Sequence, residues 1–287
     1  MPEIHQRMLK NSFLPEYIFD LKSFLIMLAG MFAASLFPAL IAGICLLVFQ
    51  KDLQTEPFFM IVLNSSGLLG AIFAFDFFSC RPAIGEALNF NLKPSKPEVY
   101  LVIFPMMLGM MLISEFLISL VPVTGPVFGK WYDTFARAME MVSMDTPTML
   151  VMTVGFAPVL EEIIFRGIIQ KGLQNKGWQP ISAIMFSSLL FAIIHGNPWQ
   201  AIGAFLLGFV LGFVYWRTGS LLNSILLHAF NNLVSCLLIL RSNSESFEIA
   251  FNIEGWKLFF AGCLIFGVAF YFFNKLPAED SRGQQFV

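Results

Sequence analysis

The sequence has little charge and few of the side chains that bind metals or form disulfides. Only 13% of its 287 residues are charged, compared with about 25% in an average soluble domain. The net charge is −2, so no basic surface indicates a nucleic-acid partner. The four cysteines have no paired spacing and three lie in apolar runs, so we expect unreactive buried thiols rather than disulfides or metal ligands.

Apolar residues dominate the composition instead. They make up 57% of the chain, and phenylalanine alone occurs 34 times. This composition predicts an all-α, polytopic membrane helix bundle. The first apolar run, 22–49, is too long for the core of a signal peptide, so we expect it to remain as a membrane span.

Eight apolar runs are candidate membrane helices. The fifth and sixth of them are short. The runs are 22–49, 57–78, 98–121, 148–171, 180–195, 199–216, 220–240 and 255–274. An even number of spans puts both termini on one side of the membrane.

Lysine and arginine indicate which side that is, because cytoplasmic loops are enriched in them. Eleven fall on the side of the termini and four on the other, without Lys257 and Arg166, which lie inside spans. The two sets are Arg7, Lys10, Lys22, Arg81, Lys93, Lys96, Lys171, Lys176, Arg217, Lys275 and Arg282 against Lys51, Lys130, Arg137 and Arg241. We therefore expect both termini in the cytoplasm.

The chain shows no linker, low-complexity tract or evident repeat, so we treat it as one unit with three parts. Residues 1–145 form a scaffold of three spans and a surface helix. Residues 148–240 hold nearly all the unusual chemistry, and 241–287 form the last span and a tail. In the stretch 128–142, Trp131, Phe135, Ala138 and Val142 share a helical face, which predicts a helix along the membrane surface. A lid over a site is the alternative interpretation.

The fourth span carries ionisable residues, which are costly in lipid. Glu162 and Arg166 lie one helical turn apart in the favourable order, so they are expected to pair. Glu161 points away from Arg166 and has no local partner. The spacing therefore favours a structural pair and a chemically free Glu161, although a buried ion-pair network of all three remains open.

Two further polar groups follow on later spans. Phe191 precedes His195 by four residues at the end of the fifth span, and Asn232 follows His228 by one turn on the seventh. If spans four and five form an antiparallel hairpin, Glu161 and His195 each lie roughly 22 Å from its turn. His228 lies about 12 Å from its own turn. We expect the three to meet inside the membrane, nearer the cytoplasmic face.

These side chains suit hydrolysis in a dry cavity. A glutamate can act as a general base on water, and an imidazole can hold that water and share protons. His228 and Asn232 can donate hydrogen bonds to a developing oxyanion. The residues thus make amide hydrolysis inside a membrane cavity a reasonable hypothesis.

The motifs EExxxR, FxxxH and HxxxN, each on its own late span, resemble those of the CPBP family of intramembrane endopeptidases. This CAAX protease and bacteriocin-processing group includes the type II CAAX prenyl endopeptidases and the bacterial Abi proteins. The resemblance covers roughly 148–240. It implies that Glu161 is the catalytic base and that His195 shares its water. It also implies that Glu162, Arg166 and Phe191 support the site, with His228 and Asn232 on the oxyanion side.

The resemblance also implies a membrane-associated peptide or protein substrate, with prenylated CAAX peptides and bacteriocin-like precursors as candidates. We expect no cofactor, because the sequence has no HExxH zinc motif. The alternative is a zinc ion bound by Glu161, His195 and His228. A non-enzymatic immunity factor or adaptor is the competing function, and the lack of a repeat counts against a transporter.

Three more features of the sequence concern contacts within the membrane. Glu115 and Asp76 lie in spans, and we expect a structural role for both rather than a catalytic one. Ala204, Gly208 and Gly212 repeat every four residues, which predicts a face for close helix packing. Packing within the chain is expected, with a dimer interface as the weaker alternative.

Overall fold

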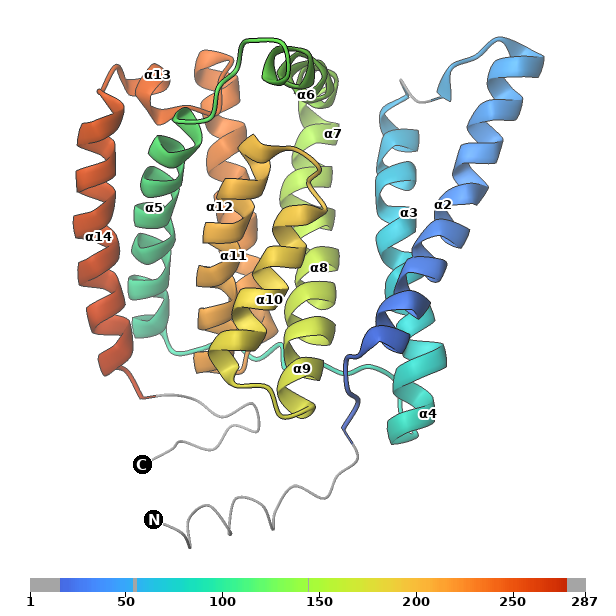
Figure 1. The fold of residues 1–287 in the computed structure, drawn as a ribbon, viewed down its shortest axis with the longest axis horizontal. Coiled ribbons are helices and arrows are strands. Elements are labelled where there is room, and N and C mark those ends of the chain that lie inside the picture. Colours follow the sequence, from blue (N-terminus) through green and yellow to red (C-terminus); the bar gives the residue numbers. More distant parts are fainter. Residues whose placement is uncertain (1–15, 54–55, 144, 278–287) are drawn as a thin grey trace, which may run out of the picture.

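The computed structural model describes residues 16–53, 56–143 and 145–277. All regular elements in these ranges are helical, and most run side by side in a bundle (Figure 1). The helix α2 begins and α14 ends at the same end of this bundle (Figure 1). The elements are α2 (Leu21–Phe49), α3 (Pro57–Phe75), η2 (Asp76–Cys80), α4 (Arg81–Ile84), α5 (Pro97–Ser119), α6 (Phe128–Ser143), α7 (Thr146–Leu150), η3 (Val151–Phe156), α8 (Ala157–Glu162), η4 (Ile163–Gln170), α9 (Lys171–Asn175), α10 (Pro180–Ile193), α11 (Pro198–Thr218), α12 (Leu221–Ser242), α13 (Phe247–Phe251) and α14 (Gly255–Lys275).

Within the described residues, seven helices are long and apolar enough to cross a membrane. Helix α10 is apolar but has only 14 residues. It ends at Ile193, two residues before the predicted end of the fifth span. These elements confirm an integral, multi-pass helical membrane protein, with the fifth apolar run shorter than expected.

The helix ends follow from local side-chain chemistry. Asn197 caps α11 by accepting a hydrogen bond from the Gln200 backbone N–H at 2.9 Å, and Pro198 occupies the first helical position. At its other end, Gly219 adopts φ 62°, a left-handed conformation that glycine tolerates without strain. Asn197 and Pro198 thus end the α10–α11 turn, which contains His195.

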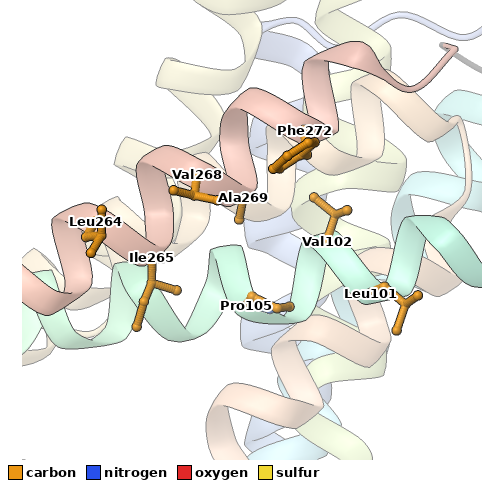
Figure 2. A pocket seen from close by; sticks show the side chains of 8 residues that line it. All are labelled: Leu101, Val102, Pro105, Leu264, Ile265, Val268, Ala269 and Phe272. Atoms are coloured by element: carbon orange, nitrogen blue, oxygen red, sulfur yellow. The ribbon is translucent and has the colours of Figure 1, made fainter.

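Helices α5 and α14 approach closely at two glycines. An added Cβ on Gly109 of α5 would lie 2.6 Å from the Phe266 backbone nitrogen of α14. An added Cβ on Gly262 would lie 2.7 Å from the Gly109 carbonyl oxygen. Farther along the same two helices lies a hollow of about 370 Å³ (Figure 2). Its eight lining side chains are all apolar, so this hollow offers no group for chemistry.

The small-residue face of α11 packs within the chain, as expected. Gly208 and Gly212 leave room for two fully buried polar side chains of η4. Arg166 Nη2 donates to the Gly208 carbonyl at 2.9 Å, and Gln170 Nε2 donates to the Gly212 carbonyl at 2.9 Å. The four-residue repeat on α11 thus matches a four-residue repeat of donors on η4.

Helix α6 lies across the end of the bundle, as Figure 1 shows. Its aromatic side chains surround Trp199 at the start of α11, with ring centroids 5.0 Å away for Tyr132 and 5.9 Å for Phe135. Trp131 also contacts this indole, at 6.1 Å. This arrangement agrees with a helix along the membrane surface. Trp131 and Ala138 of the predicted face are exposed, and the side chain of Val142 lies outside the described part of the chain.

The cysteines are free, as expected, but they are not all buried. Cys80 and Cys236 are buried, whereas Cys263 is exposed. The prediction failed at Cys263 because α14 packs against the bundle on one side only, and an apolar run does not reveal which side faces lipid.

Candidate functional site

The predicted Glu162–Arg166 pair is present at the centre of the site. Arg166 Nη1 lies 2.7 Å from Glu162 Oε1, and both side chains are fully buried. The guanidinium also lies over the ring of Phe191, with Cζ 4.9 Å from the ring centroid. Removing two charges from water costs several kcal/mol per ion, so these contacts are needed to offset that cost.

His228 of α12 joins both glutamates. Its Nδ1 lies 2.9 Å from Glu162 Oε1, and its Nε2 lies 3.7 Å from Glu161 Oε2. Glu162 Oε1 also accepts from Arg166 Nη1 at 2.7 Å, and the carboxylate of such a pair can only accept, so Nδ1–H of His228 is the donor. The other nitrogen of the ring therefore faces Glu161.

His195 follows the end of α10 and is held by its own backbone. Its Nδ1 lies 2.8 Å from the Phe191 carbonyl oxygen, which can only accept a hydrogen bond. Nδ1 is therefore protonated, and in the neutral ring Nε2 is the nitrogen left free to accept a proton. The Phe191 ring packs edge-on against both His195, at 5.1 Å, and His228, at 5.5 Å.

The side chain of Asn232 already forms two hydrogen bonds within the protein. Its Nδ2 donates to the Thr153 carbonyl at 2.7 Å, and its Oδ1 accepts from Asn231 Nδ2 at 2.9 Å. Thr153 belongs to the π-helical segment η3. A second π-helical segment, η4, begins directly after Glu162, and its Phe165 carbonyl accepts from Ser187 Oγ at 2.7 Å. The wider π turns thus present carbonyls to side chains of neighbouring helices, and such turns are frequent at functional sites.

A cavity of about 1,120 Å³ joins the predicted residues. Glu161, Phe191, His195, His228 and Asn232 all line it. Glu162 and Arg166 are absent from its described lining and lie buried behind it. The cavity also reaches the end of α5, the inner face of α6 and the loop before α13. It therefore extends to the bundle end opposite the start of α2 (Figure 1).

The two other ionisable residues of the spans have structural contacts. Glu115 Oε1 accepts from Ser246 Oγ at 2.5 Å and from the Glu248 backbone N–H at 3.0 Å, and Glu115 also lines the cavity. Asp76 forms an ion pair with Arg81 at 2.7 Å and accepts from the Leu88 backbone N–H at 2.8 Å. Both contacts agree with the structural roles expected for these residues.

The side chains of the site do not favour a bound metal ion over a metal-free site that binds water. Within the described ranges, no group of three or more His, Cys, Asp or Glu side chains is close enough to hold one metal ion. His228 Nδ1 is already bonded to Glu162, so only its Nε2 faces the cavity. Metal-free chemistry and its zinc alternative both stay predictions.

Several contacts in this site leave no signal in the sequence. No sequence motif marks the Gly208 and Thr153 carbonyls or the hydrogen bond between His228 and Glu162. The stripe of glycines on α11 was the one available signal, because a position without a side chain exposes backbone oxygen to a neighbouring helix.

Comparison with known proteins supports the expected family. Residues 143–234 match the family model described as type II CAAX prenyl endopeptidase Rce1-like. This segment contains all seven predicted site residues, and the match agrees with the resemblance that the three motifs indicated. No solved structure matches the chain.

Curated relatives are similar over parts of the chain. An uncharacterized protein YyaK of Bacillus subtilis is 29% identical over 42% of this chain and 46% of its own length. The UPF0177 protein YxdF of Lactococcus lactis is 32% identical over 26% of this chain and 41% of its own. An uncharacterized protein of Mycoplasma capricolum is 33% identical over 32% and 28%, respectively. The matched segments span less than half of each relative.

The buried ion pair yields a stability prediction. Arg166→Leu leaves Glu162 as an uncompensated buried charge, so we expect a loss of about 3–5 kcal/mol in the free energy of unfolding. Adding Glu162→Gln removes that charge and should restore part of the loss. The measurement is denaturant unfolding of the purified variants in one detergent. Losses that simply add in the double variant would contradict the pairing.

Proposed function

We propose that this protein is an intramembrane endopeptidase in which Glu161 activates water to hydrolyse a peptide bond. The observation that carries the proposal is the meeting of the three motifs in one cavity: Glu161, His195 and His228 line it together, with the ion pair directly behind. The match to CAAX prenyl endopeptidases over residues 143–234 supports the same reaction class.

In the proposed mechanism, water binds between the Glu161 carboxylate and His195 Nε2. Glu161 takes one proton as the water oxygen bonds to the substrate carbonyl carbon. The tetrahedral intermediate then collapses, the C–N bond breaks, and the proton passes to the leaving amine. The products are a new carboxylic acid and a free amine, with one water consumed.

His228 and Asn232 are the proposed donors to the oxyanion. Asn232 has one N–H left after its bond to the Thr153 carbonyl. His228 donates a hydrogen bond from Nδ1–H to Glu162, so donation from Nε2 requires the doubly protonated ring. Glu162 and Arg166 act as positioning residues, because they fix the orientation of this imidazole.

The substrate is proposed to enter from the bundle end formed by α6 and α13, where the cavity reaches the surface. The excess of lysine and arginine at the other end favours a cytoplasmic location for the termini, which would place this entrance on the opposite face. A cysteine at exposed Asp133 of α6, labelled with an impermeant maleimide in intact cells, tests this orientation. Protection of Asp133→Cys until the cells are lysed would place the entrance in the cytoplasm.

A non-enzymatic immunity factor or adaptor is the second candidate. The observation that favours it is the structural use of the polar groups, since Glu162, Arg166 and Asn232 all bind other helices. Under the endopeptidase proposal, by contrast, the substrate is a membrane-associated peptide, prenylated or not.

The test of the proposal is Glu161→Gln, which keeps the side-chain shape and removes the base. We expect roughly a 100-fold or greater loss of cleavage and an unchanged unfolding transition. Purified protein in liposomes would be assayed with a prenylated CAAX peptide and an unmodified membrane-tethered peptide. Glu254→Gln is the matched control, because Glu254 is exposed and pairs with Lys257 outside the cavity.

The same assay distinguishes the alternatives. Activity that survives a strong zinc chelator supports the metal-free mechanism, whereas loss that zinc restores would replace it with the metallopeptidase. Full activity of Glu161→Gln would rule out the proposed base. Loss of folded protein in Glu161→Gln would favour the structural role of the cluster.

A further inference from the structure

The apolar hollow between α5 and α14 faces lipid and is separate from the site of Glu161. None of the residues that line this hollow also lines the larger cavity. Leu101 is 77% exposed and Leu264 is 68% exposed, although both side chains are large and apolar. In a multi-pass membrane protein such exposed apolar surface contacts the acyl chains of lipids, which are as apolar as leucine.

The hollow is a short channel that is closed at one end. The compact Pro105 lies between longer side chains, with Leu264 at one end of the hollow and Phe272 at the other (Figure 2). These two residues of α14 are about 12 Å apart along the helix axis. The hydrocarbon core of a bilayer is about 30 Å thick, so the hollow fits within one leaflet. Beside Leu264 the helices close on each other, because an added Cβ on Gly109 would lie 2.9 Å from the Gly262 carbonyl oxygen.

Two lysines lie beyond the Phe272 end of the hollow. Lys275 follows Phe272 on the same face of α14, about 4.5 Å farther along the helix axis. Lys96 is the N-cap residue of α5 and precedes Leu101 by little more than one turn. Both lysines are exposed, and α5 begins at the end of the bundle where α14 ends (Figure 1). Their long, flexible stems let both ammonium groups reach the headgroup level next to the hollow.

The end of the bundle beside the hollow is positively charged in the described residues. Lys93 is a third exposed lysine, in the segment before α5. Glu98, in the first turn of α5, is the one acidic residue in the described segment 93–98 and the last turn of α14. Arg217 is engaged by the protein, because its Nη2 donates to the Leu276 carbonyl at 2.7 Å. Three lysines and one glutamate therefore remain to interact with a headgroup.

We propose that this hollow is a binding site for an anionic phospholipid, in which one acyl chain lies between α5 and α14 and the phosphate binds Lys275 and Lys96. Basic residues at the ends of membrane helices attract anionic headgroups, and basic pockets between such helices bind them. A second copy of this chain fits the same face less well. In a two-fold dimer the equivalent lysines of both copies would meet at one level and repel each other. The site is independent of the proposed reaction.

Lipid competition tests the site without using catalysis. The full chain, purified in detergent, is mixed with equal amounts of phosphatidylglycerol and phosphatidylcholine that carry identical acyl chains, and the retained lipids are counted by native mass spectrometry. We expect one phosphatidylglycerol per chain, retained over phosphatidylcholine by about fivefold or more, because one lysine near a headgroup contributes a preference of about that size. Equal retention of the two lipids would overturn the proposal.

Charge variants of opposite sign identify the residues that bind the headgroup. Lys275→Gln should lower the ratio of retained phosphatidylglycerol to phosphatidylcholine by about fivefold, and Glu98→Gln should raise it, because it removes a nearby negative charge. Lys130→Gln is the matched control, since Lys130 is an exposed lysine of α6 at the opposite end of the bundle (Figure 1). A ratio that falls equally in Lys275→Gln and Lys130→Gln, or in neither, would contradict the assigned headgroup position.

A bulky substitution tests whether the acyl chain occupies the hollow. Val268→Trp fills the hollow from α14, and Val48→Trp on α2 is the matched control, because these valines are 49% and 66% exposed. We expect both variants to keep the unfolding transition of the wild type and only Val268→Trp to lose the retained lipid. Equal retention in the two variants would overturn the site. A dimer that appears in the same spectra in place of bound lipid, and that Val268→Trp abolishes, would assign the hollow to a second copy instead.

Discussion

The arrangement of the central helices depends on one ion pair that has no access to water. Glu162 and Arg166 are fully buried inside a membrane span, where unpaired charge is strongly unfavourable. Their mutual contact satisfies only part of their hydrogen-bonding capacity. The remaining partners come from three other helices: the Gly208 carbonyl of α11, Nδ1 of His228 on α12 and the ring of Phe191 on α10. The pair thus requires these helices to meet at one place.

That requirement also positions Glu161 and one ring nitrogen of His228 at the cavity. Glu161 is adjacent to Glu162 in the chain but points to the cavity, because the helix directs successive side chains to different faces. His228 gives one ring nitrogen to Glu162 and keeps the other near Glu161. The buried pair thereby fixes an imidazole beside a carboxylate whose own oxygens stay available. The doubled glutamate thus separates into one residue that is buried in an ion pair and one that lines the cavity.

The sequence predicted those features that follow from helical periodicity. Spacing and hydropathy predict the Glu162–Arg166 pair, the close-packing face at Gly208 and Gly212, and the membrane bundle. The structure confirms all three. Contacts between distant helices have no such signal. The π-helical segments around α8, the bond from Asn232 to the Thr153 carbonyl and the cavity's course toward α6 depend on tertiary packing. The roles of the individual site residues stay predictions.

The claim that Glu161 and His195 act on one water is tested most directly by a double-variant comparison. Initial cleavage rates of one membrane-tethered peptide are measured for the wild type, Glu161→Gln, His195→Ala and the double variant, at equal amounts of folded protein. Residues that act as a unit show strongly non-additive losses. The account predicts that the double variant is no slower than the slower single variant. Losses that multiply in the double variant would show that the two residues act independently and would contradict the account.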